Sequence, residues 1–265
     1  MSAGVKIHST AIVHAGARVD PTAEIGPYCI AGAEVEIGAG CRLVSHVVLD
    51  GHTRLAEGVQ IYSFAAVGIA PQDLKYKNEP TAVEIGARTV IRESVTISRG
   101  TAGGGGTTRV GKDCLIMAYA HIGHDSQIGD HCILANAATL AGHVIVEEYA
   151  TVGALCPVHQ FCRIGRHAYV GGGTTITQDV LPYSLTSAKR ETHAYGLNKV
   201  GLERRGFTPV QMKELHAAYR TLLASKKNTA QALEALREQC SSGAAGEHVA
   251  YLVQFIASAE RGVIK

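Results

Sequence analysis

The sequence lacks several features that would place it in a familiar class of protein. It contains no Cys-x-x-Cys pair and no N-terminal signal peptide, and no apolar run approaches the about 18 residues of a membrane-spanning helix. Lys and Arg total 25 against 23 Asp and Glu, so the chain as a whole lacks the positive charge typical of nucleic-acid binding. We therefore expect a reduced cytoplasmic protein with no integral membrane segment and no nucleic-acid partner.

What the sequence does contain is a ladder of aliphatic residues that recur every six positions. The ladder runs from Ile7 to Val67, from Ile85 to Ile97 and from Val110 to Ile176. A period of six fits neither an α-helix nor a hairpin, but it fits short parallel strands stacked coil on coil. Three hexads make one triangular coil, so the ladder predicts a β-solenoid of roughly nine coils.

Two other residue types follow the ladder. Glycine often comes directly after a ladder residue, as at Gly26 and Gly123, which we attribute to a sharp backbone turn at a corner of the coil. Six of the seven cysteines lie four residues after a ladder position, where small residues recur, so we interpret them as packing residues: Cys29, Cys41, Cys114, Cys132, Cys156 and Cys162.

The breaks in the ladder predict loops and a second domain. We expect a solenoid over residues 1–182, with loop insertions near 68–84 and 100–109, and a helical domain over 183–265. The glycines from Gly103 to Gly106 are not followed by Lys and Ser or Thr, so they predict a flexible loop and not a phosphate-binding loop.

The C-terminal part carries helix signals. Thr208, Pro209 and Gln211 form a capping box with proline at the first helical position, and further helices are expected near 229–240 and 247–260. These helices would cap the solenoid and support oligomerisation. Residues 183–265 hold twelve basic and seven acidic side chains. This excess of positive charge suits an acidic protein partner or a phosphorylated substrate, and it suits an ordinary solvated helix surface equally well.

Histidines on the longest run of the ladder are the candidates for chemistry. An 18-residue coil places His124, Gly142 and Gln160 in one column, about 4.8 Å apart, with His143 and His159 on either side. An imidazole beside a glycine N–H supplies a general base and an oxyanion donor, the pair that acyl transfer to a hydroxyl requires. Asp125 would orient His124 only if the corner bends the two side chains together.

Longer motifs cover most of the chain and carry a family resemblance. The hexads of the form Ile-Gly-x-x-small-x are similar to those of the hexapeptide-repeat acyltransferases, and the chain resembles in particular the UDP-N-acetylglucosamine O-acyltransferases of lipid A synthesis. The motifs are Gln72-Asp73-Leu74-Lys75-Tyr76, Ile91 to Ile97, His121-Ile122-Gly123-His124-Asp125, Leu140-Ala141-Gly142-His143, Val158-His159-Gln160-Phe161 and Gly201 to Phe207.

This resemblance implies a left-handed parallel β-helix with a C-terminal α-helical domain, assembled as a homotrimer with active sites between subunits. It implies transfer of an (R)-3-hydroxyacyl group from acyl carrier protein to the 3-hydroxyl of UDP-N-acetylglucosamine, without a metal or organic cofactor. His124 would be the base, oriented by Asp125, and the Gly142 N–H would hold the oxyanion. The implied substrate contacts are Asp73, Lys75, His121, His143, His159, Gln160, Gly172 (at the acyl tail), and Asn198, Arg204 and Arg205 (at the nucleotide).

The chain departs from the family pattern at two positions. It has Glu191 where relatives commonly carry a histidine near the acyl tail, and Val200 where they commonly carry a glutamate near the nucleotide. Three other functions stay open on the residues alone. One is transfer to a 3-amino UDP-sugar, and another is a non-catalytic trimeric scaffold. The third is a zinc site like that of the solenoid carbonic anhydrases, which the spacing of His124, His143 and His159 disfavours because no two ligands are close in sequence.

Overall fold

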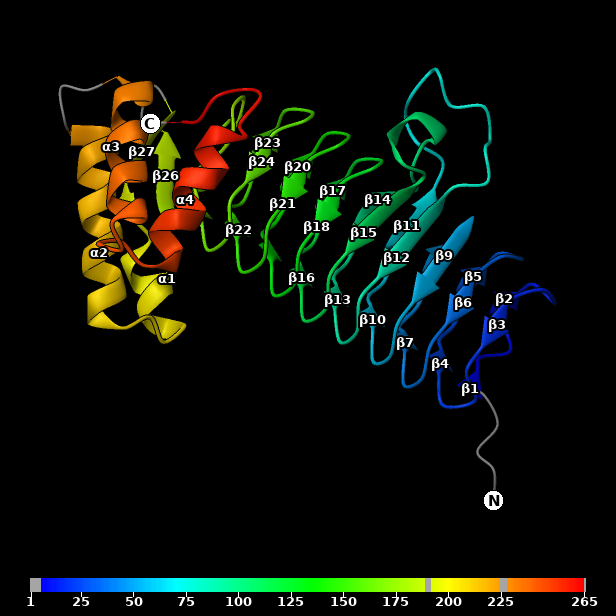
Figure 1. Ribbon diagram of the computed structural model, residues 1–265. Coiled ribbons are helices and arrows are strands. Elements are labelled where there is room, and N and C mark those ends of the chain that lie inside the picture. The colour runs from blue at the N-terminus through cyan, green and yellow to red at the C-terminus, as the bar shows by residue number, and fades with distance from the viewer. Residues whose placement is uncertain (1–5, 189–191, 225–227, 265) are drawn as a thin grey trace.

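The computed structural model describes residues 6–188, 192–224 and 228–264, and it is a three-sided prism of short strands with helices at one end. Figure 1 shows the coils stacked from β1 at the N-terminal end to the helices at the other. All pairs of strands within the coils are parallel, and each residue commonly pairs with the one 18 positions later, as Gln127 does with Ile145. The left-handed parallel β-helix predicted from the resemblance is confirmed.

The first sheet has eleven strands, nine of them from the coils. In order they are β1 (Lys6–Ile7), β4 (Glu24–Ile25), β7 (Arg42–Leu43), β10 (Gln60–Ile61), β13 (Val90–Ile91), β16 (Leu115–Ile116), β19 (Ile133–Leu134), β22 (Thr151–Val152), β25 (Tyr169–Val170), β26 (Ser184–Ala188) and β27 (Thr192–Leu197).

The second and third sheets have eight strands each. The second holds β2 (Ile12–Val13), β5 (Ile30–Ala31), β8 (Val48–Leu49), β11 (Ala66–Ile69), β14 (Thr96–Ser98), β17 (His121–Ile122), β20 (Thr139–Leu140) and β23 (Pro157–Val158). The third holds β3 (Arg18–Val19), β6 (Glu36–Ile37), β9 (His52–Leu55), β12 (Ala82–Ile85), β15 (Thr107–Val110), β18 (Gln127–Ile128), β21 (Ile145–Val146) and β24 (Arg163–Ile164).

The ladder residues form the core of the prism. Ile61, Ile97 and Ile122 are completely buried, because each points into the prism and stacks on the ladder residue of the next coil. Ile7, at the start of the ladder, is 44% exposed because no described coil lies beyond it. The periodicity therefore predicts the core correctly, and the burial is incomplete only at the open end.

The glycines that follow the ladder have a different cause from the one we expected. Gly26 and Gly123 do not adopt positive φ; the left-handed residues come later in each corner and are often not glycine, such as Tyr28 (φ 57°) and Asp125 (φ 60°). A Cβ on Gly26 would lie 1.8 Å from the carbonyl oxygen of Val44 in the next coil. These glycines are needed because two backbones approach closely, and the turn itself is made by other residues.

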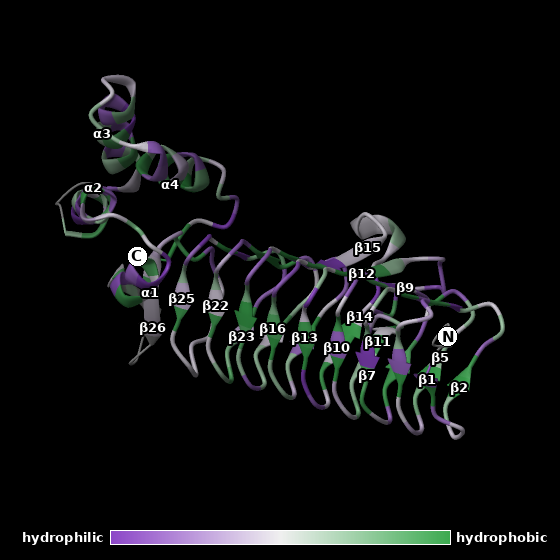
Figure 2. Cartoon of the chain, turned by 90° about the horizontal axis from the view of Figure 1, so that it is seen from below, coloured by the Kyte–Doolittle hydropathy of each residue, from purple (hydrophilic) through white to green (hydrophobic). Residues whose placement is uncertain are grey.

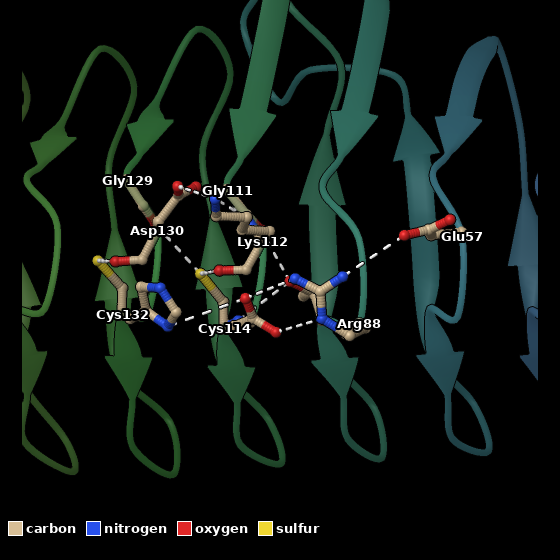
Figure 3. Close-up of polar contacts among 11 residues, drawn as sticks. Glu57, Arg88, Gly111, Lys112, Cys114, Gly129, Asp130 and Cys132 are labelled. Atoms are coloured by element: carbon tan, nitrogen blue, oxygen red, sulfur yellow. Dashed lines mark hydrogen bonds and ion pairs between the residues drawn. The ribbon is translucent and has the colours of Figure 1, made fainter.

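Ion pairs link neighbouring coils at the corner between the third and first sheets (Figure 3). The Arg88 guanidinium donates to both carboxylate oxygens of Asp113, at 2.7 and 2.8 Å, and lies 3.5 Å from Glu57. Lys112 pairs with Asp130 of the next coil at 3.5 Å. These ion pairs are solvent-exposed, so each contributes at most about 1 kcal/mol to stability.

The buried cysteines are packing residues, as predicted. The Cys114 thiol donates to the Gly129 carbonyl at 3.1 Å, and the Cys41 thiol donates to the Ala56 carbonyl at 3.0 Å. Burial raises the pKa of the Cys41 and Cys156 thiols, so both stay protonated donors at neutral pH. All seven cysteines are free thiols.

The C-terminal part begins with strands that we did not predict. β26 pairs in parallel with β25, and β27 returns antiparallel to β26, so the first sheet continues past the end of the ladder. The helices follow as α1 (Lys199–Arg204), α2 (Pro209–Tyr219), the π-helical turn η2 (Arg220–Ala224), α3 (Thr229–Ser241) and α4 (Glu247–Ala257). The division of the chain into two domains stays a prediction.

The helices gather at the C-terminal end of the prism, which Figure 2 shows from below. The capping box predicted at Thr208 is present, since its side chain accepts from the Gln211 N–H and the Gln211 side chain accepts from the Thr208 N–H. Leu215, Leu236 and Leu252 form a second core with Leu181 of the prism end. No helix in the described part of the chain combines the length and apolarity that a membrane span requires.

The buried ladder predicts where the fold is sensitive. Ile122→Ala should destabilise the protein by roughly 2–5 kcal/mol, because it leaves a cavity in the dry interior of the prism. Ile12→Ala is the matched control, since Ile12 is 65% exposed, and it should cost less than about 1 kcal/mol. Chemical denaturation of both variants measures the difference, and equal losses would contradict the assignment of the core.

Candidate active site

One corner of the prism, from the second to the third sheet, gathers most of the predicted site. We call it the site corner. The two long loops of the solenoid, 70–81 between β11 and β12 and 99–106 between β14 and β15, both emerge there and project from the prism (Figure 1). His124, Gly142 and Gln160 lie at the same corner in the three following coils. The insertions therefore stand beside the histidine column.

Backbone hydrogen bonds place this column in register. The N–H of His143 donates to the carbonyl of His124 at 2.9 Å, and the N–H of Phe161 donates to the carbonyl of Gly142 at 3.3 Å. The His124 ring lies against the Gly142 backbone, because a Cβ on Gly142 would be 2.6 Å from Cε1 and Nε2 of His124. Within the described residues the Gly142 N–H has no hydrogen-bond acceptor, so it is available to a ligand.

His124 and Asp125 form a dyad. Asp125 has φ +60°, which turns its side chain back toward that of its neighbour, and Nδ1 of His124 lies 2.8 Å from Oδ2 of Asp125. The bend that the sequence argument required is therefore present. A carboxylate accepts the Nδ1 proton of a neutral imidazole and leaves Nε2 as the free basic nitrogen.

Thr101 fixes the carboxylate of the dyad. Its backbone N–H donates to Oδ1 of Asp125 at 2.9 Å, and its hydroxyl donates to Oδ2 at 2.6 Å. Gly104, in the short helix η1 (Ala102–Gly104), packs so closely that a Cβ there would lie 2.1 Å from the Asp125 carboxylate. Thr101 cannot be predicted from the hexad spacing, because it lies in a break of the ladder where no period predicts a neighbour.

Other histidines surround the dyad. The His143 ring stacks on Phe161 at 4.5 Å and meets the His124 ring edge-on at 5.0 Å. Nδ1 of His121 lies 2.7 Å from the Thr96 hydroxyl. Burial, and to a smaller extent the neighbouring His124, lowers the pKa of His121, so this ring is neutral at pH 7.

Three of these side chains also come within range of a shared metal ion. The ligand atoms of His124, Asp125 and His143 lie within 4.8 Å of one another. However, Asp125 already accepts two hydrogen bonds from Thr101 and one from His124, which leaves little of its carboxylate for a metal. The arrangement therefore fits a histidine base, His124, that is oriented by a carboxylate better than it fits a metal centre.

The other predicted contacts lie apart from the dyad. Oδ1 of Asp73 accepts from the Lys75 N–H at 2.9 Å within the first loop, which Arg99 anchors through a 2.7 Å hydrogen bond to the Tyr76 hydroxyl. Neither Asp73 nor Lys75 has a hydrogen bond or ion pair with the dyad in the described structure.

Gly172 lies at a different corner, between the first and second sheets, in the coil after Ala154. A Cβ on Gly172 would come 3.3 Å from the Ala154 carbonyl oxygen and 3.8 Å from the Ala154 nitrogen, with no closer neighbour. Asn136 lies one coil earlier, since the Leu155 N–H donates to its carbonyl at 3.0 Å. Glu191 lies outside the described residues.

Asn198, Arg204 and Arg205 gather at a third place, around α1. Asn198 caps this helix through the Gly201 N–H, and its Nδ2 donates to the carbonyl of His167 at 3.0 Å. Arg205 lies over the Tyr149 ring at 5.4 Å, and burial lowers the pKa of its guanidinium. With Val200 these residues line a cavity of about 640 Å³. In one chain this cavity is separate from the site corner.

Comparison with known proteins agrees with this geometry. Residues 179–264 match the family model described as UDP-N-acetylglucosamine O-acyltransferase, domain 2, and residues 107–142 match the bacterial transferase hexapeptide model of six repeats. The solved UDP-N-acetylglucosamine acyltransferase of Francisella novicida is 37% identical, covering 97% of this chain and 93% of that one, with a TM-score of 0.94.

Two further solved structures extend the match. The UDP-N-acetylglucosamine O-acyltransferase of Moraxella catarrhalis is 38% identical over 98% of this chain and 99% of its own, with a TM-score of 0.91. The Arabidopsis UDP-N-acetylglucosamine acyltransferase is 34% identical over 98% and 100%, with a TM-score of 0.84. The chain belongs to the UDP-N-acetylglucosamine O-acyltransferase family. The predicted family and enzyme class, an acyltransferase, are confirmed.

The dyad gives Thr101 a measurable role in this acyltransferase. Thr101→Val removes the hydroxyl donor but keeps the backbone donor, so Asp125 should hold His124 less firmly and kcat should fall about tenfold with KM unchanged. Thr101→Ser keeps the hydroxyl and should retain most of the activity. Steady-state kinetics of the two variants decide, and equal rates in both would contradict a role for this hydroxyl.

Proposed function

We propose that this protein transfers an (R)-3-hydroxyacyl group from acyl carrier protein to the 3-hydroxyl of UDP-N-acetylglucosamine, as the first step of lipid A synthesis. The observation that carries the proposal is the His124–Asp125 dyad packed against the Gly142 backbone. Membership of the family supports the acceptor, because the solved relatives are described as UDP-N-acetylglucosamine acyltransferases.

The dyad performs the transfer in two steps. Nε2 of His124 takes the proton of the sugar 3-hydroxyl as its oxygen attacks the thioester carbonyl, and Asp125 stabilises the imidazolium that forms. The Gly142 N–H donates to the negative oxygen of the tetrahedral intermediate. The intermediate collapses to the ester, and the imidazolium returns its proton to the departing thiolate. The thioester is already activated, so this chemistry requires no metal or organic cofactor.

The remaining predicted residues bind the substrates. Arg204 and Arg205 suit the diphosphate by charge and fork geometry, and Asn198 lies beside them in the same cavity. Around the site corner, contacts to the sugar and the acyl donor come from Asp73, Lys75, His121, His143, His159 and Gln160. Gly172 leaves space for the acyl tail, because only the Ala154 backbone lies near it.

Homotrimer formation would bring the two groups of residues together. In one chain the α1 cavity lies on the first sheet, whereas the site corner joins the second and third sheets, so a complete site requires a second copy to place its Arg204 and Arg205 near His124. A cytoplasmic location and acyl carrier protein as donor belong to the same proposal. The basic C-terminal part suits such an acidic protein partner.

The direct test is mass spectrometry of the products that the purified protein makes from UDP-N-acetylglucosamine and a panel of (R)-3-hydroxyacyl carrier proteins. We expect a product heavier by one hydroxyacyl group, and a rate at least about a hundredfold lower for His124→Ala, which lacks the base. His14→Ala is the control, because His14 is an exposed histidine at the same corner of the prism, far from the dyad.

The other outcomes contradict the mechanism or select a different function. A His124→Ala protein with full activity contradicts the mechanism. A product only with a 3-amino UDP-sugar selects an amine acceptor, and no product with any donor or acceptor selects a non-catalytic scaffold.

A further inference from the structure

The C-terminal tail beyond α4 returns to the prism. The Asp179 N–H donates to the Gly262 carbonyl at 3.1 Å, the Ile264 N–H donates to the Asp179 carbonyl at 2.8 Å, and Val263 bridges Asp179 in parallel. Ile264 is only 5% exposed and belongs to the solenoid core, not to the helical core. The tail therefore docks on the last coil as an additional short strand, and its Ile264 side chain covers the end of the ladder.

Arg163 fixes the start of this tail. Its guanidinium donates to the Phe255 carbonyl at 2.9 Å and the Ser258 hydroxyl at 3.3 Å, at the end of α4, and to Oδ2 of Asp179 at 3.0 Å. The guanidinium also lies over the Phe255 ring at 4.2 Å. Both ends of the segment between α4 and Ile264 are thus attached to the prism, which limits where the residues between them can lie.

Arg261 lies between these two attachments and reaches the site corner. Its Nη1 is 2.8 Å from Nδ1 of His159 and also donates to the carbonyl of Gln160. A guanidinium can only donate, so both atoms accept from it, and acceptance at Nδ1 places the His159 ring proton on Nε2. His159 Nδ1 and the Gln160 carbonyl oxygen lie 3.1 Å apart because both accept hydrogen bonds from the Arg261 guanidinium.

The position of this contact relates it to the dyad. Gln160 lies one coil beyond Gly142, whose carbonyl accepts from the adjacent Phe161 N–H, and Phe161 stacks on His143. Beside them, His143, Phe161, Arg163 and Arg261 line a cavity of about 290 Å³. The Arg261 guanidinium, which is distant in sequence, thus contacts the coil next to the one that carries Gly142.

We propose that Arg261 is a positioning residue for acyl transfer. It fixes the Gln160 peptide and the His159 ring, and so makes the substrate-binding side of the site corner depend on the docked C-terminal tail. The inference rests on the proposed function, because its effect is on substrate binding. Since Arg261 holds groups that contact substrate and not the base itself, its loss should raise KM more than it lowers kcat.

The test compares Arg261→Met, which keeps the length but removes the donors, with Arg261→Lys, which keeps one cationic donor. In Arg261→Met we expect KM for at least one of the two substrates, the acyl carrier protein or UDP-N-acetylglucosamine, to rise about tenfold, with kcat within about threefold of wild type. In Arg261→Lys we expect this KM to recover in part. Arg220→Met is the control, since the exposed Arg220 does not line the cavity beside Arg261 and its side chain has no hydrogen bond or ion pair in the described structure, and it should match wild type.

Two further measurements accompany the kinetics. Nitrogen-15 NMR of His159, assigned with His159→Gln, should show the Nε2–H tautomer in the wild-type protein and its loss in Arg261→Met. Thermal denaturation should show Tm of Arg261→Met within about 5 °C of wild type. A larger fall in Tm would overturn the proposal in favour of a purely structural anchor.

The outcomes separate this inference from the proposed function. An unchanged KM in a folded Arg261→Met protein, beside an active wild type, contradicts the positioning role alone, as does an unchanged His159 tautomer. A wild-type protein that turns over no substrate contradicts the proposed function itself, and the role of Arg261 in it.

Discussion

The backbone hydrogen bonds between consecutive coils are the constraint on which the rest of this structure depends. At the site corner, for example, the Gly123 N–H donates to the Leu140 carbonyl at 2.9 Å. Because each coil repeats the direction of the one before it, residues 18 positions apart stand in columns one strand spacing apart. A histidine in one coil therefore lies against the backbone of the next without any special loop to bring it there.

The corners add the second requirement of the site, which is direction. Successive side chains on a strand point to opposite faces, so His124 and Asp125 could not meet on a flat strand. The left-handed conformation of Asp125 turns the chain and lets Nδ1 approach the carboxylate. The same conformation recurs at other corners, where Tyr28 and His46 stack at 4.9 Å. The dyad thus uses a turn that the fold makes in nearly every coil.

Insertions and the C-terminal tail supply what the repeat cannot. A pure solenoid would leave Asp125 facing solvent, whereas Thr101 and Gly104 of the second loop cover its carboxylate. The last coil would likewise be open, whereas the tail covers it with Ile264 and brings Arg261 to the site corner. The repeated coils therefore place His124 and Gly142 next to each other, and the second loop and the C-terminal tail fix the side chains and backbone around them.

This division explains which features could be predicted from the sequence. The six-residue period predicts the solenoid fold, the buried core and the column of His124, Gly142 and Gln160. Each of these follows from counting positions along a regularly repeating backbone. Thr101, Arg261 and the strands β26 and β27 do not follow the period, and their contacts depend on loop paths that no spacing encodes. The reason for the glycines after the ladder is also not readable from the sequence, because the close approach of neighbouring backbones is visible only in three dimensions.

The central claim is that His124 acts from its position against the Gly142 backbone, and turnover by a Gly142→Ala protein tests it most directly. A Cβ at that position would lie 2.6 Å from Cε1 and Nε2 of His124, so the ring must move while the backbone, which has no positive φ there, can stay. We expect Tm of Gly142→Ala to stay close to wild type while acyl transfer falls by at least about a hundredfold. Wild-type turnover in a folded Gly142→Ala protein would contradict it.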